Sequence, residues 1–120
     1  MAGFEDLIVW HKAMALVETV YRVSDGFPRE EIYGLTAQIR RCAVSVPSNI
    51  AEGEGRRSRN DFARFLQIAN GSLMELRTQL LIAERLKFVN RESIQQPVKQ
   101  IDEVGRMLHG LIAGCKSTQP

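Results

Sequence analysis

The residues with the clearest chemical potential lie between Arg40 and Asp61, in the stretch RRCAVSVPSNIAEGEGRRSRND. Arg56, Arg57 and Arg59 stand close together there, directly after a Gly-x-Gly turn. A guanidinium group binds phosphate or carboxylate through two parallel hydrogen bonds, so this cluster predicts an anionic partner. The competing interpretation is a solvated turn whose arginines pair with carboxylates of their own chain.

The turn does not have the pattern of a nucleotide pocket. In the Gly53-Glu54-Gly55 run, the third glycine of a dinucleotide fingerprint is replaced by Ser58, and no strand precedes it. Ser58 has N-cap spacing, so the free N–H groups of a following helix could hold a phosphate. We therefore predict contacts with an RNA or DNA backbone rather than with a bound nucleotide. The residues expected to make these contacts are Arg40, Arg56, Arg57, Arg59 and Arg64.

Polar residues also recur every three or four positions in the same stretch and again after residue 70. This spacing places them on a strip of two successive helices, beside the apolar stripe. If those helices fold back on each other, Arg41 lies level with Ser72 and one turn from Glu75. That register predicts a partly buried ion pair, while Asn49 or a serine satisfies backbone groups that Pro47 leaves unpaired. Ligand binding is the alternative. The polar strip consists of Arg41, Ser45, Asn49, Glu52, Ser72 and Glu75.

No arrangement of residues indicates catalysis or metal binding. His11 and His109 are isolated on amphipathic segments, without a serine, cysteine or carboxylate at a catalytic spacing. Cys42 and Cys115 each lie in an apolar helical stripe, which predicts buried free thiols rather than a disulfide or a zinc site. No Glu-x-x-His motif occurs that would hold two metals inside a bundle. We expect no catalytic residues, no metal, no cofactor and no enzymatic activity.

Hydrophobic periodicity predicts four amphipathic helices, at about residues 5–24, 29–52, 59–86 and 91–113. No segment alternates with period two over more than a few residues, so strands are not expected. Short connections make successive helices antiparallel neighbours. We therefore predict one all-α domain over residues 1–120, an antiparallel up-down-up-down four-helix bundle.

Four details of these helices can be tested directly. The second helix is expected to continue past Pro47 with a kink, and the glycines of Gly53-Glu54-Gly55 are expected to supply the positive φ angles that end it. The start of the fourth helix is open: Asn90 or Ser93 caps it, or Pro97 marks its first turn. The expected core stripe of the first helix is Leu7, Trp10, Met14, Val17 and Tyr21, with Leu16 and Val20 beside it.

The composition fits a soluble globular protein. Of 120 residues, 44% are hydrophobic and 25% are charged, and the net charge is +2. The cations comprise twelve arginines and four lysines, a choice that favours ion-pair networks or an anionic partner. The N-terminal stretch lacks a basic region, and no apolar run is long enough to span a bilayer. We expect a cytoplasmic protein without membrane contact.

The order of these features resembles a known family, the 23S rRNA-intervening-sequence proteins, also called four-helix bundle proteins. The resemblance covers nearly the whole chain, and its most specific part is the segment Ser45-Val46-Pro47-Ser48-Asn49-Ile50-Ala51-Glu52-Gly53. The other matching segments are Phe4-x-x-Leu7-x-x-Trp10-x-x-Ala13, Phe27-Pro28-x-x-Glu31-x-x-Gly34-Leu35-x-x-Gln38-x-x-Arg41 and Phe65-Leu66-x-x-Ala69-x-Gly71-Ser72-x-x-Glu75.

The resemblance implies a small bacterial protein, although the family name does not establish ribosomal binding. The family is similar to the accessory protein of diversity-generating retroelements, a pentameric bundle that binds a reverse transcriptase and nucleic acid. It therefore implies a homopentamer here, with the polar strip at the subunit interface as a further possibility. Two functions are carried forward. The first is a non-enzymatic oligomer that binds RNA or DNA backbone; the alternative is a protein-interaction scaffold that does not bind nucleic acid.

Overall fold

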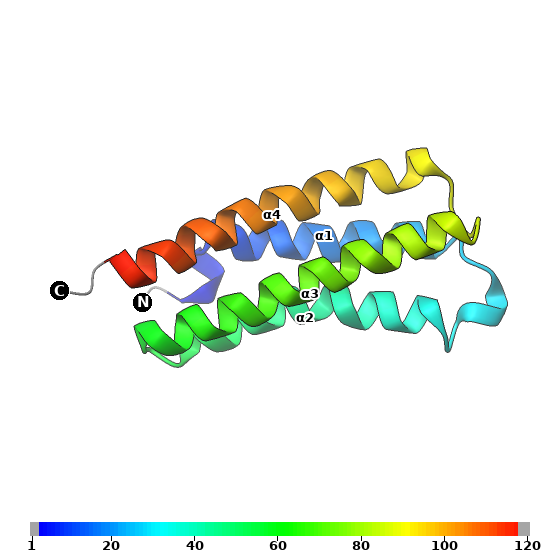
Figure 1. Cartoon of the computed structure of the whole chain (residues 1–120). Helices are drawn as coiled ribbons and strands as arrows, with labels where there is room; N and C mark the ends of the chain where they lie inside the picture. Colours follow the sequence, from blue (N-terminus) through cyan, green and yellow to red (C-terminus); the bar gives the residue numbers. More distant parts are fainter. Residues whose placement is uncertain (1–2, 118–120) are drawn as a thin grey trace.

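The computed structural model describes residues 3–117, and within them the chain is all-α, with four long helices and no strand (Figure 1). The all-α prediction is confirmed. The molecule is elongated, with principal extents of 51 × 21 × 19 Å. In chain order the elements are the 3-10 helix η1 Phe4–Asp6, α1 Ile8–Ser24, the 3-10 helix η2 Arg29–Glu31, α2 Leu35–Gly55, α3 Arg59–Arg85 and α4 Arg91–Ser117.

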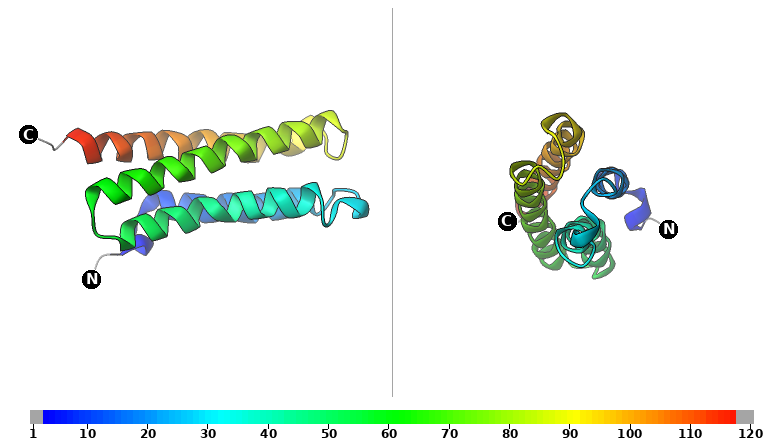
Figure 2. Two further views of the ribbon diagram at one scale, coloured as in Figure 1. Left: turned by 60° about the horizontal axis from the view of Figure 1, so that its bottom comes forward. Right: turned by 90° about the vertical axis from the view of Figure 1, so that its right-hand side faces the viewer.

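Each α-helix packs against its neighbour in the sequence, and α1 also contacts α4, so the four helices surround one core (Figure 2). The chain turns back along the bundle at each connection (Figure 1). As a result, the α2–α3 turn and the C-terminal part of α4 lie at the same end of the molecule. The other two connections lie at the opposite end.

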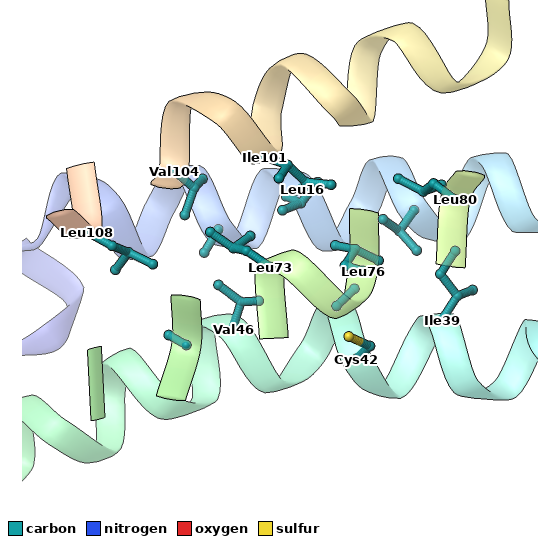
Figure 3. Close-up of a cluster of buried hydrophobic side chains, with 14 of the residues drawn as sticks. Leu16, Ile39, Cys42, Val46, Leu73, Leu76, Leu80, Ile101, Val104 and Leu108 are labelled. Carbon is teal, nitrogen blue, oxygen red and sulfur yellow. The ribbon is translucent and has the colours of Figure 1, made fainter. Parts of the chain in front are cut away.

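Aliphatic side chains from all four helices fill this core (Figure 3). Burial of each such side chain contributes about 1.5–3 kcal/mol, so the stripes rather than intrinsic propensity hold the helices in place. The largest side chains with almost no solvent exposure include Leu16, Ile39, Ile50, Leu66, Leu73, Leu76, Leu80, Ile101 and Leu108.

The predicted stripe of the first helix is partly wrong. The most buried residues of α1 are Val9, Ala13, Leu16 and Val20. Met14 and Tyr21, which were predicted to face the core, are 41% and 43% exposed. The helix carries two adjacent apolar stripes, and packing against both α2 and α4 selects the one between them. The remaining members of the predicted stripe, Leu7, Trp10 and Val17, are partly buried against the edge of the core.

The second helix begins later than predicted, at Leu35 rather than at residue 29. The residues before it form η2 and a turn in which the Glu31 side chain accepts a hydrogen bond from the backbone N–H of Leu35, at 3.1 Å. This carboxylate substitutes for a cap at the start of α2. The helix then continues through Pro47, which is buried, so the prediction of a single helix is confirmed. The kink at Pro47 stays a prediction.

The glycines that were expected to end α2 have a different role. No glycine among the described residues has a positive φ; instead Arg57 has φ 59°. Gly53 is buried inside the helix, where an added Cβ would lie 2.6 Å from the Cβ of Phe65. Gly53 is therefore required by the close approach of α2 and α3, and the left-handed residue that turns the chain is an arginine.

The starts of α3 and α4 follow the sequence signals. The Ser58 side chain accepts a hydrogen bond from the backbone N–H of Asp61, at 3.3 Å. Asn90 does the same for Ser93, at 2.9 Å, so Asn90 is the N-terminal cap of α4. Pro97 lies inside α4, whose end is four residues later than residue 113. In the part of the chain that the structure describes, no helix combines the length and the apolar character needed to cross a membrane.

Candidate functional site

The α2–α3 turn brings four of the predicted arginines to one end of the bundle. α2 ends at Gly55, Arg57 adopts the left-handed conformation, and Ser58 caps α3. Only three residues separate the two helices, so Arg56 to Arg64 occupy a small region of the surface. The sequence prediction of a basic turn at this position agrees with the geometry.

Arg56 and Arg64 both lie over the ring of Phe65. Their guanidinium carbons are 5.2 Å and 4.6 Å from the ring centroid. Each also has an acidic partner nearby in the chain, Glu52 for Arg56 at 3.1 Å and Asp61 for Arg64 at 3.5 Å. Such exposed pairs contribute little to stability, about 0–1 kcal/mol each. The contacts order the two side chains while leaving each about half exposed.

Arg57 and Arg59 are exposed, as Arg56 and Arg64 are. Both line a cleft beside the turn, together with Ser58 and residues of α4. Glu54 lies on the same cleft. The region therefore combines the self-paired arginines anticipated by the competing interpretation with two further arginines that line a cleft.

Arg40 is not part of this cluster, and its inclusion is corrected. It lies near the start of α2, at the opposite end of the bundle from Arg56 (Figure 2). Its Nε donates to Ser24 Oγ at 2.8 Å, and its Nη2 lies 3.4 Å from Asp25 Oδ1. The guanidinium group also lies over the ring of Tyr21, 4.6 Å from the centroid. Arg40 thus joins α2 to the end of α1, a structural role.

The polar strip gathers where α2 faces α3, but the predicted ion pair is absent from the described residues. Arg41 is exposed and forms no salt bridge with Glu75. Both line a surface hollow of about 310 Å³ between the two helices. The other residues that line this hollow are Gln38, Cys42, Ser45, Ser72 and Gln79.

Two further strip residues, Ser45 and Asn49, form hydrogen bonds within α2. Ser45 Oγ donates to the carbonyl of Cys42 at 2.6 Å, and Asn49 Nδ2 donates to the carbonyl of Ser45 at 2.8 Å. Neither bond reaches the carbonyl of Ala43, four residues before Pro47, which is the one a proline leaves without its helical donor. The strip therefore reinforces α2 around the proline without replacing the missing bond. Glu52 pairs with Arg56 instead of with the strip.

Cys42 is the residue of this region that sequence reasoning placed only in the core. Its thiol donates to the carbonyl of Ser72 at 3.1 Å, bridging α2 to α3. Burial, together with the nearby Glu75 carboxylate, raises the pKa of Cys42 to about 12. The thiol is thus held protonated, consistent with the predicted buried free cysteine. Ser72 lies 30 residues after Cys42 in the chain, so no local sequence pattern indicated this hydrogen bond.

No other constellation among residues 3–117 indicates chemistry. No group of three His, Cys, Asp or Glu side chains in that range lies close enough together to hold a metal ion. The two histidines bind backbone carbonyls, His11 that of Glu5 at 2.7 Å and His109 that of Gly105 at 3.0 Å. Two ion pairs that were not predicted attach α4 to its neighbours, Arg77–Asp102 at 2.6 Å and Lys12–Glu103 at 3.4 Å.

A comparison with models of protein families shows to which family the chain belongs. The family model described as 23S rRNA-intervening sequence protein matches residues 5–110. The chain belongs to this family. The match to the 23S rRNA-intervening sequence proteins includes all of α1, α2 and α3, the arginine turn and the polar strip. No curated protein matches the chain.

Proposed function

We propose that this member of the 23S rRNA-intervening sequence protein family is a non-enzymatic, cytoplasmic RNA- or DNA-binding protein. In this proposal an up-down-up-down bundle assembles into a homopentamer, and each subunit presents its α2–α3 turn to the sugar–phosphate backbone. The observation that carries the proposal is the grouping of Arg56, Arg57, Arg59 and Arg64 at one end of the bundle.

The electrostatics of the turn favour a repeated, weak contact over one strong site. Three carboxylates, Glu52, Glu54 and Asp61, lie among the four arginines. A single subunit therefore offers a small net positive charge, too little for tight binding alone. Repetition around an oligomer makes later contacts intramolecular and raises the overall affinity. Few amide side chains accompany the arginines, so the proposal expects little base preference in the backbone contacts.

Salt dependence tests this proposal. We expect RNA affinity to fall steeply between about 50 and 200 mM salt, because each neutralised phosphate releases counterions. Replacing Arg56, Arg57 and Arg59 together with alanine should lower the affinity and flatten that dependence. The matched control replaces Arg29, Arg85 and Arg91, which changes the net charge equally at the opposite end of the bundle. Equal effects of the two triple substitutions, or none, would remove the turn as the binding site.

A second candidate function, a protein-interaction scaffold, has its own support. α2 and α3 carry exposed apolar side chains: Ile68 is 44% exposed, Ile82 41%, and Val44, which lines a second hollow with Arg41 and Ser45, 40%. The two isoleucines share the face of α3 that carries Glu75, because all three are spaced seven residues apart. Exposed apolar patches beside polar residues are common where proteins meet. Affinity purification that recovers a partner protein but no nucleic acid would favour this function.

A further inference from the structure

A second cleft, the α1–α4 cleft, lies at the opposite end of the bundle from the α2–α3 turn (Figure 1). It is bounded by the C-terminal part of α1, the turn between α3 and α4, and the first turns of α4. Its volume is about 900 Å³, which lies within the range of roughly 300–1,000 Å³ found for clefts that hold small molecules. The backbone contact proposed for the α2–α3 turn does not involve this cleft.

Positive charge predominates on the rim of the α1–α4 cleft. Arg22, Lys87 and Arg91 line it, and Glu84 is the one carboxylate among the described lining residues. Arg91 Nε lies 4.0 Å from Glu84 Oε2, at the outer limit for an ion pair. The Arg22 guanidinium donates to the Thr19 hydroxyl at 3.2 Å. Neither Arg22 nor Lys87 forms an ion pair within the described chain, so their charges are not neutralised there.

The floor of the α1–α4 cleft is apolar. Val23, Phe88 and Val89 line it, and all three are partly buried and packed against the core. The Phe88 ring lies 6.0 Å from the ring of Phe27, centroid to centroid. The backbone N–H of Phe88 also donates to the carbonyl of Ala83 at 2.9 Å, which closes the end of α3. The floor is therefore held in place by the fold itself, without a ligand.

Three separate elements bring the cations to this floor. Arg22 lies in the last turn of α1. Lys87 follows the C-cap Leu86 of α3 in the left-handed conformation, with φ 62°, a common way for a helix to end. Arg91 is the first residue of α4, directly after its cap Asn90. The rim and the floor together suit an anion that carries an apolar or aromatic group.

We propose that the α1–α4 cleft binds a small organic phosphate. Its phosphate groups lie among the three cations of the rim, because guanidinium and ammonium groups form strong, charge-assisted hydrogen bonds with phosphate. Its apolar or aromatic part covers the floor, which inorganic phosphate alone would leave in contact with water. The inference goes beyond the proposed function, since it uses none of the arginines of the α2–α3 turn.

The probe is ADP, with inorganic pyrophosphate and adenosine as its two halves, each titrated by calorimetry at low salt. We expect ADP to bind more tightly than pyrophosphate by about 5- to 100-fold, the range for stacking one base on an aromatic side chain. Adenosine should bind more weakly than ADP, because it lacks the phosphates that the rim recognises. This order of affinities separates an organic phosphate from a phosphate alone.

The first pair of variants tests the rim. Arg22→Gln/Lys87→Gln should weaken ADP binding by at least about 10-fold, the loss of one charge-assisted hydrogen bond. The matched control is Arg29→Gln/Arg85→Gln, which changes the net charge equally at the same end of the bundle. Both control residues are exposed and lie outside the cleft. The control should leave ADP affinity unchanged. Circular dichroism and thermal unfolding establish that each variant folds.

The second pair adds a charge without changing the size of a side chain. Gln96 lines the cleft near the start of α4, whereas the adjacent Gln95 does not, and both are exposed. Gln96→Glu should lower ADP affinity about 5-fold, the effect of one repelling unit charge roughly 4 Å away in water. Gln95→Glu carries the same net charge and should bind ADP as the wild type does.

Four results would overturn the inference. The first is a wild type that does not bind ADP at low salt. The second is an equal loss of affinity in the two members of either pair of variants, which would indicate attraction to the whole molecule. The third is pyrophosphate binding as tight as that of ADP, which would leave the floor without a role. The fourth is displacement of ADP by single-stranded RNA, which would make the cleft part of a nucleic-acid surface. The first three do not affect the proposal for the α2–α3 turn.

Discussion

At the scale of single residues, Gly53 determines how closely α2 and α3 approach. A Cβ at this position would lie 2.6 Å from the Cβ of Phe65 and 3.3 Å from the ring of Phe62. The first contact involves an atom fixed to the backbone of α3, so rotation of a side chain cannot relieve it. The same residue lines the cleft beside the α2–α3 turn, so the spacing of the two helices and the width of that cleft are linked.

Gly53→Ala should therefore destabilise the bundle, although alanine is the better helix former. We expect a loss of about 1–3 kcal/mol in the free energy of unfolding, typical of overpacking in a closely packed interior. Gly71→Ala is the matched control, because an added Cβ there meets nothing within 4 Å. It should stabilise α3 by up to about 1 kcal/mol. Denaturant unfolding of both variants measures the difference, and equal effects would contradict the close-approach explanation.

The Cys42 thiol gives a pH dependence whose sign can be worked out. Its pKa rises from 9.0 to about 12 in the folded protein. Below pH 9 the thiol is protonated in both states, so its contribution to stability is complete. Between pH 9 and 12 the unfolded chain loses the proton while the folded protein keeps it. The free energy of unfolding then falls by about 1.4 kcal/mol per pH unit, roughly 4 kcal/mol in total.

Comparison with Cys42→Ala isolates this effect from lysine and tyrosine titration. The alanine variant should lose stability less steeply above pH 9 than the wild type does. Denaturant unfolding at pH 8, 9 and 10 measures the two slopes. The same protonation should make Cys42 react slowly with iodoacetamide at neutral pH, since the thiolate is the nucleophile. Parallel slopes and rapid labelling would contradict a raised pKa.

At the scale of the helices, signals within a few residues of the chain predicted more than the periodicity that should identify the buried face of a helix. Ser58 was predicted as an N-cap and Asn90 was one of the starts left open for the fourth helix; each bonds a backbone N–H three residues ahead in the chain. The buried face of α1 was not visible, because Met14 and Leu16 lie on adjacent apolar stripes and only packing against α2 and α4 chooses between them. Arg40 was misplaced for the same reason: its partners are 15–19 residues away.

The two caps differ in strength, which yields a prediction for the starts of α3 and α4. Asn90 Oδ1 accepts bonds from both the backbone N–H and the hydroxyl of Ser93, at 2.9 Å and 2.8 Å. Ser58 accepts one bond, at 3.3 Å. Asn90→Ala should cost about 1 kcal/mol of unfolding free energy, within the range for lost caps, and Ser58→Ala less. Thermal unfolding of both variants measures this order, and a larger effect at Ser58 would contradict it.

At the scale of the whole molecule, the candidate site was only partly predictable. The arginine turn is a local feature, so Arg56, Arg57 and Arg59 could be grouped from their spacing. The cleft beside this turn could not be predicted, because Phe62 and Gly110 come together only through the packing of α4 near the start of α3. The register of the two helices predicted that Arg41 and Glu75 lie close together, and both line the same hollow. The expected ion pair between them does not form within the described chain.

The proposed homopentamer gives the prediction at this scale, with the outer face of α2 and α3 as its expected interface. Val44→Glu/Ile68→Glu places carboxylates on two exposed apolar positions of these helices, so the mass in solution should fall from that of an oligomer to that of one subunit. Met74→Glu/Leu81→Glu is the control, because these exposed side chains lie on a different face of α3. Light scattering measures the masses. A wild type of single-subunit mass would remove the homopentamer altogether.

The packing of α1 against α4 has a consequence for synthesis on the ribosome. The first three helices can pack on one another as they emerge, since each contacts the helix made immediately before it. α4 is made last, and its Ile101, Val104 and Leu108 complete the core around Leu16 and Leu73 (Figure 3). Until α4 emerges, the apolar surfaces that it covers face water, which favours aggregation or recruitment of a chaperone. Translation pauses within α4 should therefore lower the yield of soluble protein, because they prolong this exposure.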